Sequence, residues 1–292
     1  MSPKQVWRLL KEAFQEWNQD DASRLAAALA FYTIFSLAPL LIIVIAIASL
    51  IFDQATVQDQ LMQQVQDLIG ESGAEALTTV LDNANRPGES SGVVASLVGV
   101  VLLLVGATGV LAQLQTSLNI IWNVRTRPDM GILGFVRKRL LSLGMIIAVG
   151  FLLLVSLVLS SVLAGFSDYL QTLMPGLSTL TQLLDLLLAF GLITLLFAVI
   201  YRFLPDVRIA WGDIWFGAAV TALLFTLGKF AIGLYLGRSS VGAAYGAAGS
   251  VIVLLVWIFY SAQILFFGAE VTQVYARRYG SQIEPNRYAI KR

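Results

Sequence analysis

Cysteine and histidine are both absent from this chain of 292 residues. Without cysteine there is no disulfide, no thiolate nucleophile and no zinc–thiolate site. Without histidine the chain lacks the commonest metal ligand and the only side chain whose unperturbed pKa lies near neutrality. These absences exclude much of enzyme chemistry, so the sequence predicts a protein that is not an enzyme and that has no cofactor and no metal site.

Charge is also scarce, since charged residues make up 13% of the chain against about 25% in an ordinary soluble domain. Hydrophobic residues make up 58%, and the mean hydropathy is +0.79. A soluble protein of this length could not bury so much apolar surface. The composition therefore indicates an integral membrane protein.

Six apolar stretches are long enough to cross a bilayer, because about 20 helical residues span about 30 Å of hydrocarbon. They cover residues 25–52, 93–112, 140–165, 183–204, 214–236 and 247–272. We therefore predict an all-α fold, a polytopic transmembrane helical bundle of about six spans in one domain, 25–272. The second span is expected to continue as a helix to Trp122.

The distribution of Lys and Arg predicts the orientation, because these residues are concentrated in cytoplasmic loops. Sixteen of the nineteen fall in segments that six spans place on one side of the membrane. Both termini are therefore expected in the cytoplasm (N-in/C-in) of a bacterial cell, with the chain in the inner membrane. No cleavable signal peptide is expected, since residues 1–24 are polar and amphipathic.

The long connection 53–92, on the opposite side, carries seven acidic residues and one basic residue. Its apolar positions recur at helical spacing and predict two short helices broken at Gly70–Gly73, a helical periplasmic cap. This outer loop either packs on the bundle as a solvated cap or offers a docking surface to a periplasmic or envelope protein.

Two cytoplasmic segments flank the membrane domain. Residues 1–24 place Trp7, Phe14 and Trp17 on one helical face, opposite basic residues, as expected for an amphipathic helix at an anionic lipid surface. Residues 273–292 form a basic tail. Because the basic residues are spread through membrane-flanking loops, we expect membrane lipids as partners and no nucleic acid. The sequence does not indicate an oligomeric state.

Polar residues interrupt the first two spans. Tyr32 and Ser36 share one helical face with Pro39, which removes a backbone donor and predicts a bend acting as a hinge. Gln115 and Asn119 lie one turn apart at the end of the second helix. These groups either pack helices together or line a cavity.

Small residues in the second helix and before the sixth span allow close helix packing or a mobile gate. They are Gly106, Gly109, Gly242 and Gly246. Tyr245 lies within the second of these groups, and we count it with Tyr32, Ser36, Gln115, Asn119 and Lys229 as candidates for lining a cavity or contacting a substrate.

Ionisable residues inside spans are costly and often functional. Asp185, Lys229 and Glu270 qualify. Lys229 either pairs with Asp185 or faces a polar cavity that would suit an anionic group. Glu270 either reaches the interface or pairs with a basic residue such as Arg24 or Arg202.

Several short segments together resemble the YihY/BrkB family of bacterial inner-membrane proteins. They are Ala26–Tyr32, Ser36–Pro39, Leu118–Trp122, Tyr201–Pro205, Gly228–Phe230, Tyr245–Ala247 and Gly268–Glu270. The resemblance implies a six-helix inner-membrane protein, and the family name carries an association with virulence and serum resistance. The family was formerly labelled ribonuclease BN, but the lack of histidine and of a cytoplasmic carboxylate cluster argues against a metal-dependent nuclease.

The kinked first helix, the glycines and the buried charges favour a transporter or translocation factor for an envelope amphiphile, a lipid or another small molecule. The alternative is a membrane scaffold that does not transport and binds an envelope protein through its acidic outer loop.

The charge count makes a direct prediction about topology. A reporter that is active only outside the cytoplasm should work when fused near Asp67 or Asp168, and fail when fused near Asp129 or after Arg278. The opposite pattern of activity would overturn the predicted orientation.

Overall fold

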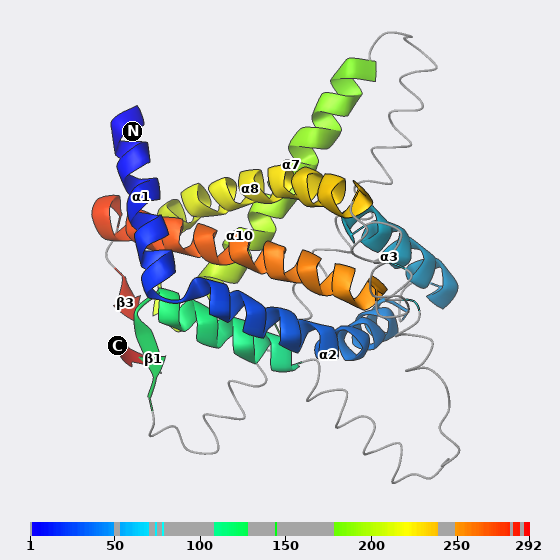
Figure 1. Ribbon diagram of the computed structural model, residues 1–292, viewed down its shortest axis with the longest axis horizontal. Coiled ribbons are helices and arrows are strands. Elements are labelled where there is room, and N and C mark those ends of the chain that lie inside the picture. Colours follow the sequence, from blue (N-terminus) through cyan, green and yellow to red (C-terminus); the bar gives the residue numbers. More distant parts are fainter. Residues whose placement is uncertain are drawn as a thin grey trace.

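The computed structural model describes residues 2–49, 53–69, 74, 78, 108–127, 144, 178–238, 249–280, 283–286 and 289–292. The side chains of residues 38–40 and 178–185 are among those not described. Figure 1 shows long helices lying side by side, with both chain ends at the same end of the bundle. We call this the termini end and the opposite one the far end.

Long apolar helices dominate the described part of the chain. They are α2 (Ala22–Ala48), α7 (Ser178–Phe203), α8 (Trp211–Arg238) and α10 (Gly249–Tyr279). Within the described residues, three segments are long and apolar enough to cross a membrane: Leu186–Phe203, Trp211–Ile232 and Val251–Tyr279. They correspond to the predicted fourth, fifth and sixth spans.

The other predicted spans are described only in part. Helix α2 covers most of the first span and continues through Pro39, and a shorter apolar helix, Ala22–Leu37, is recognised within it. A helical segment, 108–121, contains the end of the predicted second span and its extension. The third span, 140–165, lies outside the described residues except for Gly144. The bend expected at Pro39 stays a prediction.

The chain begins with α1 (Pro3–Gln19), which lies across the termini end at a steep angle to α10 (Figure 1). Pro3 suits the first helical position because its missing N–H needs no partner there. The backbone N–H of Ser2 donates to Oε1 of Gln5 at 2.7 Å. Asp21, whose backbone lies in the left-handed region (φ 53°), then redirects the chain from α1 to α2. We call residues 20–22 the α1–α2 elbow.

At the far end, α3 (Gln54–Ile69) packs on α2. Val57 contacts the end of α2 near Ile45, and Leu61 lies against Leu41. The helix ends directly before the first glycine of the predicted break at residues 70–73, which lie outside the described residues.

Two small antiparallel pairings attach the C-terminal segment to the termini end. Strand β1 (Val124–Thr126) pairs with β4 (Ala289–Lys291), and β2 (Val207–Arg208) pairs with β3 (Glu284–Pro285). The sequence analysis did not predict these strands. They are too short to show the alternation that marks a strand in sequence.

Helices α8 and α10 approach each other closely along a seam of reciprocal glycine–threonine contacts. A Cβ added at Gly217 of α8 would overlap the side chain of Thr272 of α10. One turn along α8 the roles reverse, since a Cβ at Gly268 of α10 would overlap Thr221 of α8. Both threonine hydroxyls donate at 2.7 Å to the carbonyl four residues earlier in their own helix, so they are satisfied in an apolar setting.

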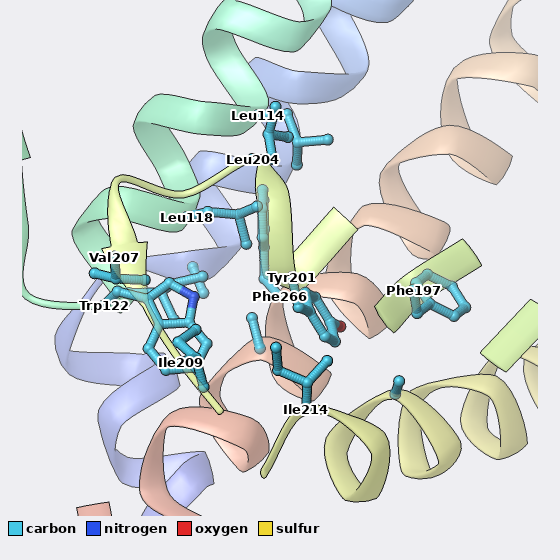
Figure 2. Close-up of a cluster of buried hydrophobic side chains, with 14 of the residues drawn as sticks. Leu114, Leu118, Trp122, Phe197, Tyr201, Leu204, Val207, Ile209, Ile214 and Phe266 are labelled. Carbon is cyan, nitrogen blue, oxygen red and sulfur yellow. The ribbon is translucent and has the colours of Figure 1, made fainter. Parts of the chain in front are cut away.

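The seam also holds α7 in place. The hydroxyl of Tyr201, fully buried, donates to the carbonyl of Leu265 at 2.7 Å and lies 3.0 Å from the hydroxyl of Thr221. Figure 2 shows Tyr201 beside Phe266 in the buried cluster, which also includes Trp122 and Ile209. One phenol therefore connects three helices.

Replacing either seam glycine by alanine should force α8 and α10 apart. We expect Gly217→Ala and Gly268→Ala to lower the free energy of unfolding by about 1–3 kcal/mol, as overpacking does. Gly191→Ala in α7 is the matched control, because nothing lies within 4 Å of a Cβ there. Thermal unfolding in detergent measures the effect, and equal stability of all three variants would contradict the close contact.

Candidate functional site

A groove of about 360 Å³ lies where α1 meets the seam between α8 and α10. Its lining residues come from these three helices. They are Phe14 and Trp17 of α1, Leu224, Leu227, Gly228 and Ala231 of α8, and Tyr260, Gln263, Ile264 and Phe267 of α10. Its walls are almost wholly apolar, and its size is that of a small-molecule site.

Helix α1 lies over the seam through one broad apolar face. Leu9 and Ala13 are buried against Val271 and Val274 of α10. The rings of Phe14 and Trp17 stack with their centroids 5.8 Å apart and form one wall of the groove. Phe14 is 59% exposed, so this face also suits contact with lipid.

Glycine shapes the α8 side of the groove. A Cβ at Gly228 would lie 2.8 Å from Cε1 of Tyr260 and 2.6 Å from Cδ1 of Ile264. These separations are too short for a real contact. Gly228 therefore lets both α10 side chains approach the α8 backbone, which forms part of the groove lining.

Two polar side chains line the groove beside the apolar ones. Nε2 of Gln263 donates to Oγ of Ser23 at 2.9 Å, whereas its Oε1 is buried with no partner among the described residues. The indole Nε1 of Trp17 is likewise buried and, within the described part of the chain, unpaired. Both residues thus line the groove, while these two unpaired atoms are themselves buried.

Towards the termini end, charged residues hold α1 on α10. Nη2 of Arg277 contacts Glu12 at 2.7 Å and Glu16 at 2.8 Å, and Arg278 also pairs with Glu12. These partly exposed pairs form a network with bridging carboxylates, the arrangement in which surface ion pairs contribute most. The elbow adds Asp20, 4.0 Å from Nη1 of Arg292 in the tail.

Burial raises the pKa of Asp20 above its ordinary value. The negative charges of Glu16 and Asp21 raise it further, and Arg292 opposes the shift. One oxygen of Asp20 has no hydrogen-bond partner in the described structure, and neither oxygen of Glu270, which is fully buried on α10, has one.

Asp206 is the centre of a second polar cluster at the termini end. It is 6% exposed and follows directly on the Tyr201–Pro205 segment. Four side chains donate to its carboxylate: Asn119 at 2.9 Å, Gln115 at 3.3 Å, Thr126 at 3.3 Å and Asn286 at 3.5 Å.

Backbone groups complete this cluster. The N–H of Asp206 donates to Oδ1 of Asn119 at 2.8 Å, and its carbonyl accepts from the N–H of Asn286 at 3.0 Å. Gln115 and Asn119, two candidates for a cavity lining, are thus brought together, but around a carboxylate. Sequence reasoning missed Asp206, because a charged residue in a loop next to a membrane helix is unremarkable.

Tyr32 and Ser36 lie beside Gly109, as their shared helical face predicts. A Cβ at Gly109 would be 3.6 Å from Oγ of Ser36 and 3.8 Å from Cδ1 of Tyr32. Ser36 is buried, whereas Tyr32 is 45% exposed. Neither lines the groove, and this contact is one of helix packing.

The charged candidates have local partners where the structure describes them. Arg24 pairs with Asp21 at 3.1 Å, and Arg202 donates to the carbonyl of Ile209 and lies over the ring of Trp211. Neither pairs with Glu270. Lys229 is partly buried next to Gly228 of the groove.

The remaining candidates cannot be placed. The side chains of Asp185 and Pro39, and all of Gly106, Gly242, Tyr245 and Gly246, lie outside the described residues. The Lys229–Asp185 pair therefore stays a prediction. Within the described part of the chain, no group of three or more Asp or Glu residues could hold a metal ion.

The apolar helices and the polar clusters at one end define a helical integral membrane protein. A family model described as virulence factor BrkB matches residues 13–290. The chain belongs to this family, as the resemblance of its short segments indicated.

Relatives carry the description "UPF0761 membrane protein". The protein of Albidiferax ferrireducens is 30% identical over 274 residues, covering 92% of this chain and 61% of the relative. That of Verminephrobacter eiseniae is 31% identical over 274 residues, covering 91% and 62%. That of Pseudomonas aeruginosa is 29% identical over 253 residues, covering 86% and 58%.

This chain thus spans about three fifths of the length of the curated relatives that it matches. No solved structure matches it.

Asp206→Asn tests the polar cluster, because it keeps the shape of the side chain but turns one acceptor into a donor. At least one of the amide or hydroxyl groups that donate to Asp206 would then face another donor. We therefore expect the free energy of unfolding to fall by about 1.5–3 kcal/mol. Glu284→Gln in β3, where the side chain is exposed, is the control. Unfolding midpoints compare the two, and unchanged stability of Asp206→Asn would rule out a structural role of the carboxylate.

Proposed function

We propose that the protein is a translocation factor for an amphiphile or lipid of the cell envelope, and that the groove at α1, α8 and α10 binds the apolar part of this substrate. The observation that carries the proposal is the groove itself, with almost wholly apolar walls and the polar residues Trp17 and Gln263 in its lining. Apolar walls with a few polar groups are what an amphiphile requires.

The position of the groove supports this proposal. It lies along helices of membrane-spanning length, and α1, which closes one side, lies across the termini end of the bundle (Figure 1). A tryptophan beside the interface suits a headgroup, because indole combines an apolar ring with one N–H donor.

We further propose the bacterial inner membrane as the location, with six spans and both termini in the cytoplasm. The support is the concentration of Lys and Arg in the predicted cytoplasmic segments and the position of both chain ends at one end of the bundle (Figure 1). Helix α1 would then lie at the cytoplasmic lipid surface.

Filling the groove should impair translocation. Ala231→Phe places a ring at the groove wall, and excluding two methylene groups of a bound chain, each contributing about 0.8 kcal/mol, should weaken binding about tenfold. Leu223→Phe is the matched control, since Leu223 is on the same helix, is 52% exposed and does not line the groove.

The measurement is transbilayer movement of a fluorescent phospholipid in liposomes that contain equal amounts of each variant. We expect slow movement with Ala231→Phe and wild-type movement with Leu223→Phe. Movement no faster with the wild-type protein than in protein-free liposomes would count against the proposal.

A further inference from the structure

The strongest unexplained feature is a buried acid on α10. Glu270 has a relative exposure of 0%, and both of its carboxylate oxygens are unpartnered within the described residues. Gln273, one turn further along and 3% exposed, also has an unpartnered Oε1. Asp20 of the elbow has an unpartnered Oδ2 and lies close enough to Glu270 to interact electrostatically.

Every one of these unpartnered atoms is an oxygen acceptor. An ionised carboxylate at Glu270 has acceptors only and no donor. A buried charge without a counter-charge or hydrogen bonds is also costly by several kcal/mol. A protonated carboxyl, in contrast, is uncharged and has one donor.

The cations nearby do not neutralise Glu270. Arg277 of the same helix is shared by Glu12 and Glu16, and Arg278 also pairs with Glu12. In the elbow, Arg24 pairs with Asp21, and Arg292 of the tail faces Asp20. Among the charged groups that act on Glu270, the carboxylates of Asp20 and Glu16 disfavour its ionised form, and Arg277, which is shared with Glu12 and Glu16, favours it.

We propose that Glu270 is a proton-binding site, in which the buried carboxyl group carries a proton at neutral pH. The proton comes from water and returns to water, and no other bond changes. A bound metal ion is a weaker explanation, because the described residues contain no group of three acidic side chains suited to one. The proposal is independent of lipid translocation.

The site lies where α1 and the elbow pack on α10. Loss of the proton adds an unpaired negative charge beside Glu16 and Asp20, which weakens this contact. Stability is therefore present while Glu270 is protonated and is lost as the pH rises and the proton leaves. The raised pKa of Asp20 acts in the same direction, because its ionisation in the folded state is also disfavoured.

Infrared spectroscopy of the purified 292-residue chain in lipid nanodiscs tests protonation directly. At neutral pH the wild type should show the C=O stretch of a protonated carboxylic acid. Glu270→Gln should lose this band, and Glu284→Gln, at an exposed position, should keep it. A band that is missing in the wild type, or unchanged by Glu270→Gln, would overturn the proposal.

The pH dependence of thermal unfolding gives a second measurement. The unfolding temperature of the wild type should fall from mildly acidic to mildly alkaline pH, and the fall should be smaller in Glu270→Gln, whose amide cannot ionise. Equal falls would overturn the proposal. If Glu270→Gln does not fold, Asp20→Asn replaces it in the infrared experiment: the band should persist at a shifted frequency, and loss of the whole band would assign the proton to Asp20 instead.

Discussion

The close approach of α8 and α10 determines the arrangement of the described helices. Gly217 of α8 lies against Thr272 of α10, and Gly268 of α10 lies against Thr221 of α8. The two backbones can therefore approach this closely only at this register. In a bilayer there is little hydrophobic force between helices, and van der Waals contact between small residues replaces it. Tyr201 adds α7 to the pair through a hydrogen bond to α10 and a close contact with Thr221 of α8. A larger residue at either glycine would displace all three.

The same seam creates the surface on which α1 lies. Leu9 and Ala13 pack where α8 and α10 are close, and the groove opens further along, beside Phe14 and Trp17. Ion pairs from Arg277 to Glu12 and Glu16 then fix α1 against rotation. The groove therefore depends both on the glycine contacts, which position its α8 and α10 walls, and on the charged contacts, which position its α1 wall.

The sequence was sufficient to locate membrane helices, because a long apolar run can satisfy its backbone in lipid only as a helix. It also marked Gln115 and Asn119 as unusual, since amides are rare at such positions. It could not identify their partner. Asp206 and Asn286 are far from them in the chain and lie in segments without periodic pattern, so the Asp206 cluster exists only through the pairing of short strands at the termini end. The glycine–threonine seam was missed for a similar reason, because small residues indicate close packing without naming the helix that approaches.

Charge pairing was the least predictable feature, because near neighbours compete with distant ones. Arg24 pairs with Asp21, three residues earlier in the chain. Arg202 contacts the carbonyl of Ile209 and the ring of Trp211, which follow it around the connection between α7 and α8. Each gains a contact there without leaving the interface, where an arginine keeps most of its hydration. Pairing with Glu270 would require burial of the guanidinium, at a cost that one ion pair does not reliably offset. The carboxyl group of Glu270 is therefore buried with no hydrogen-bond partner among the described residues, and a proton is the smallest ligand that would neutralise its charge.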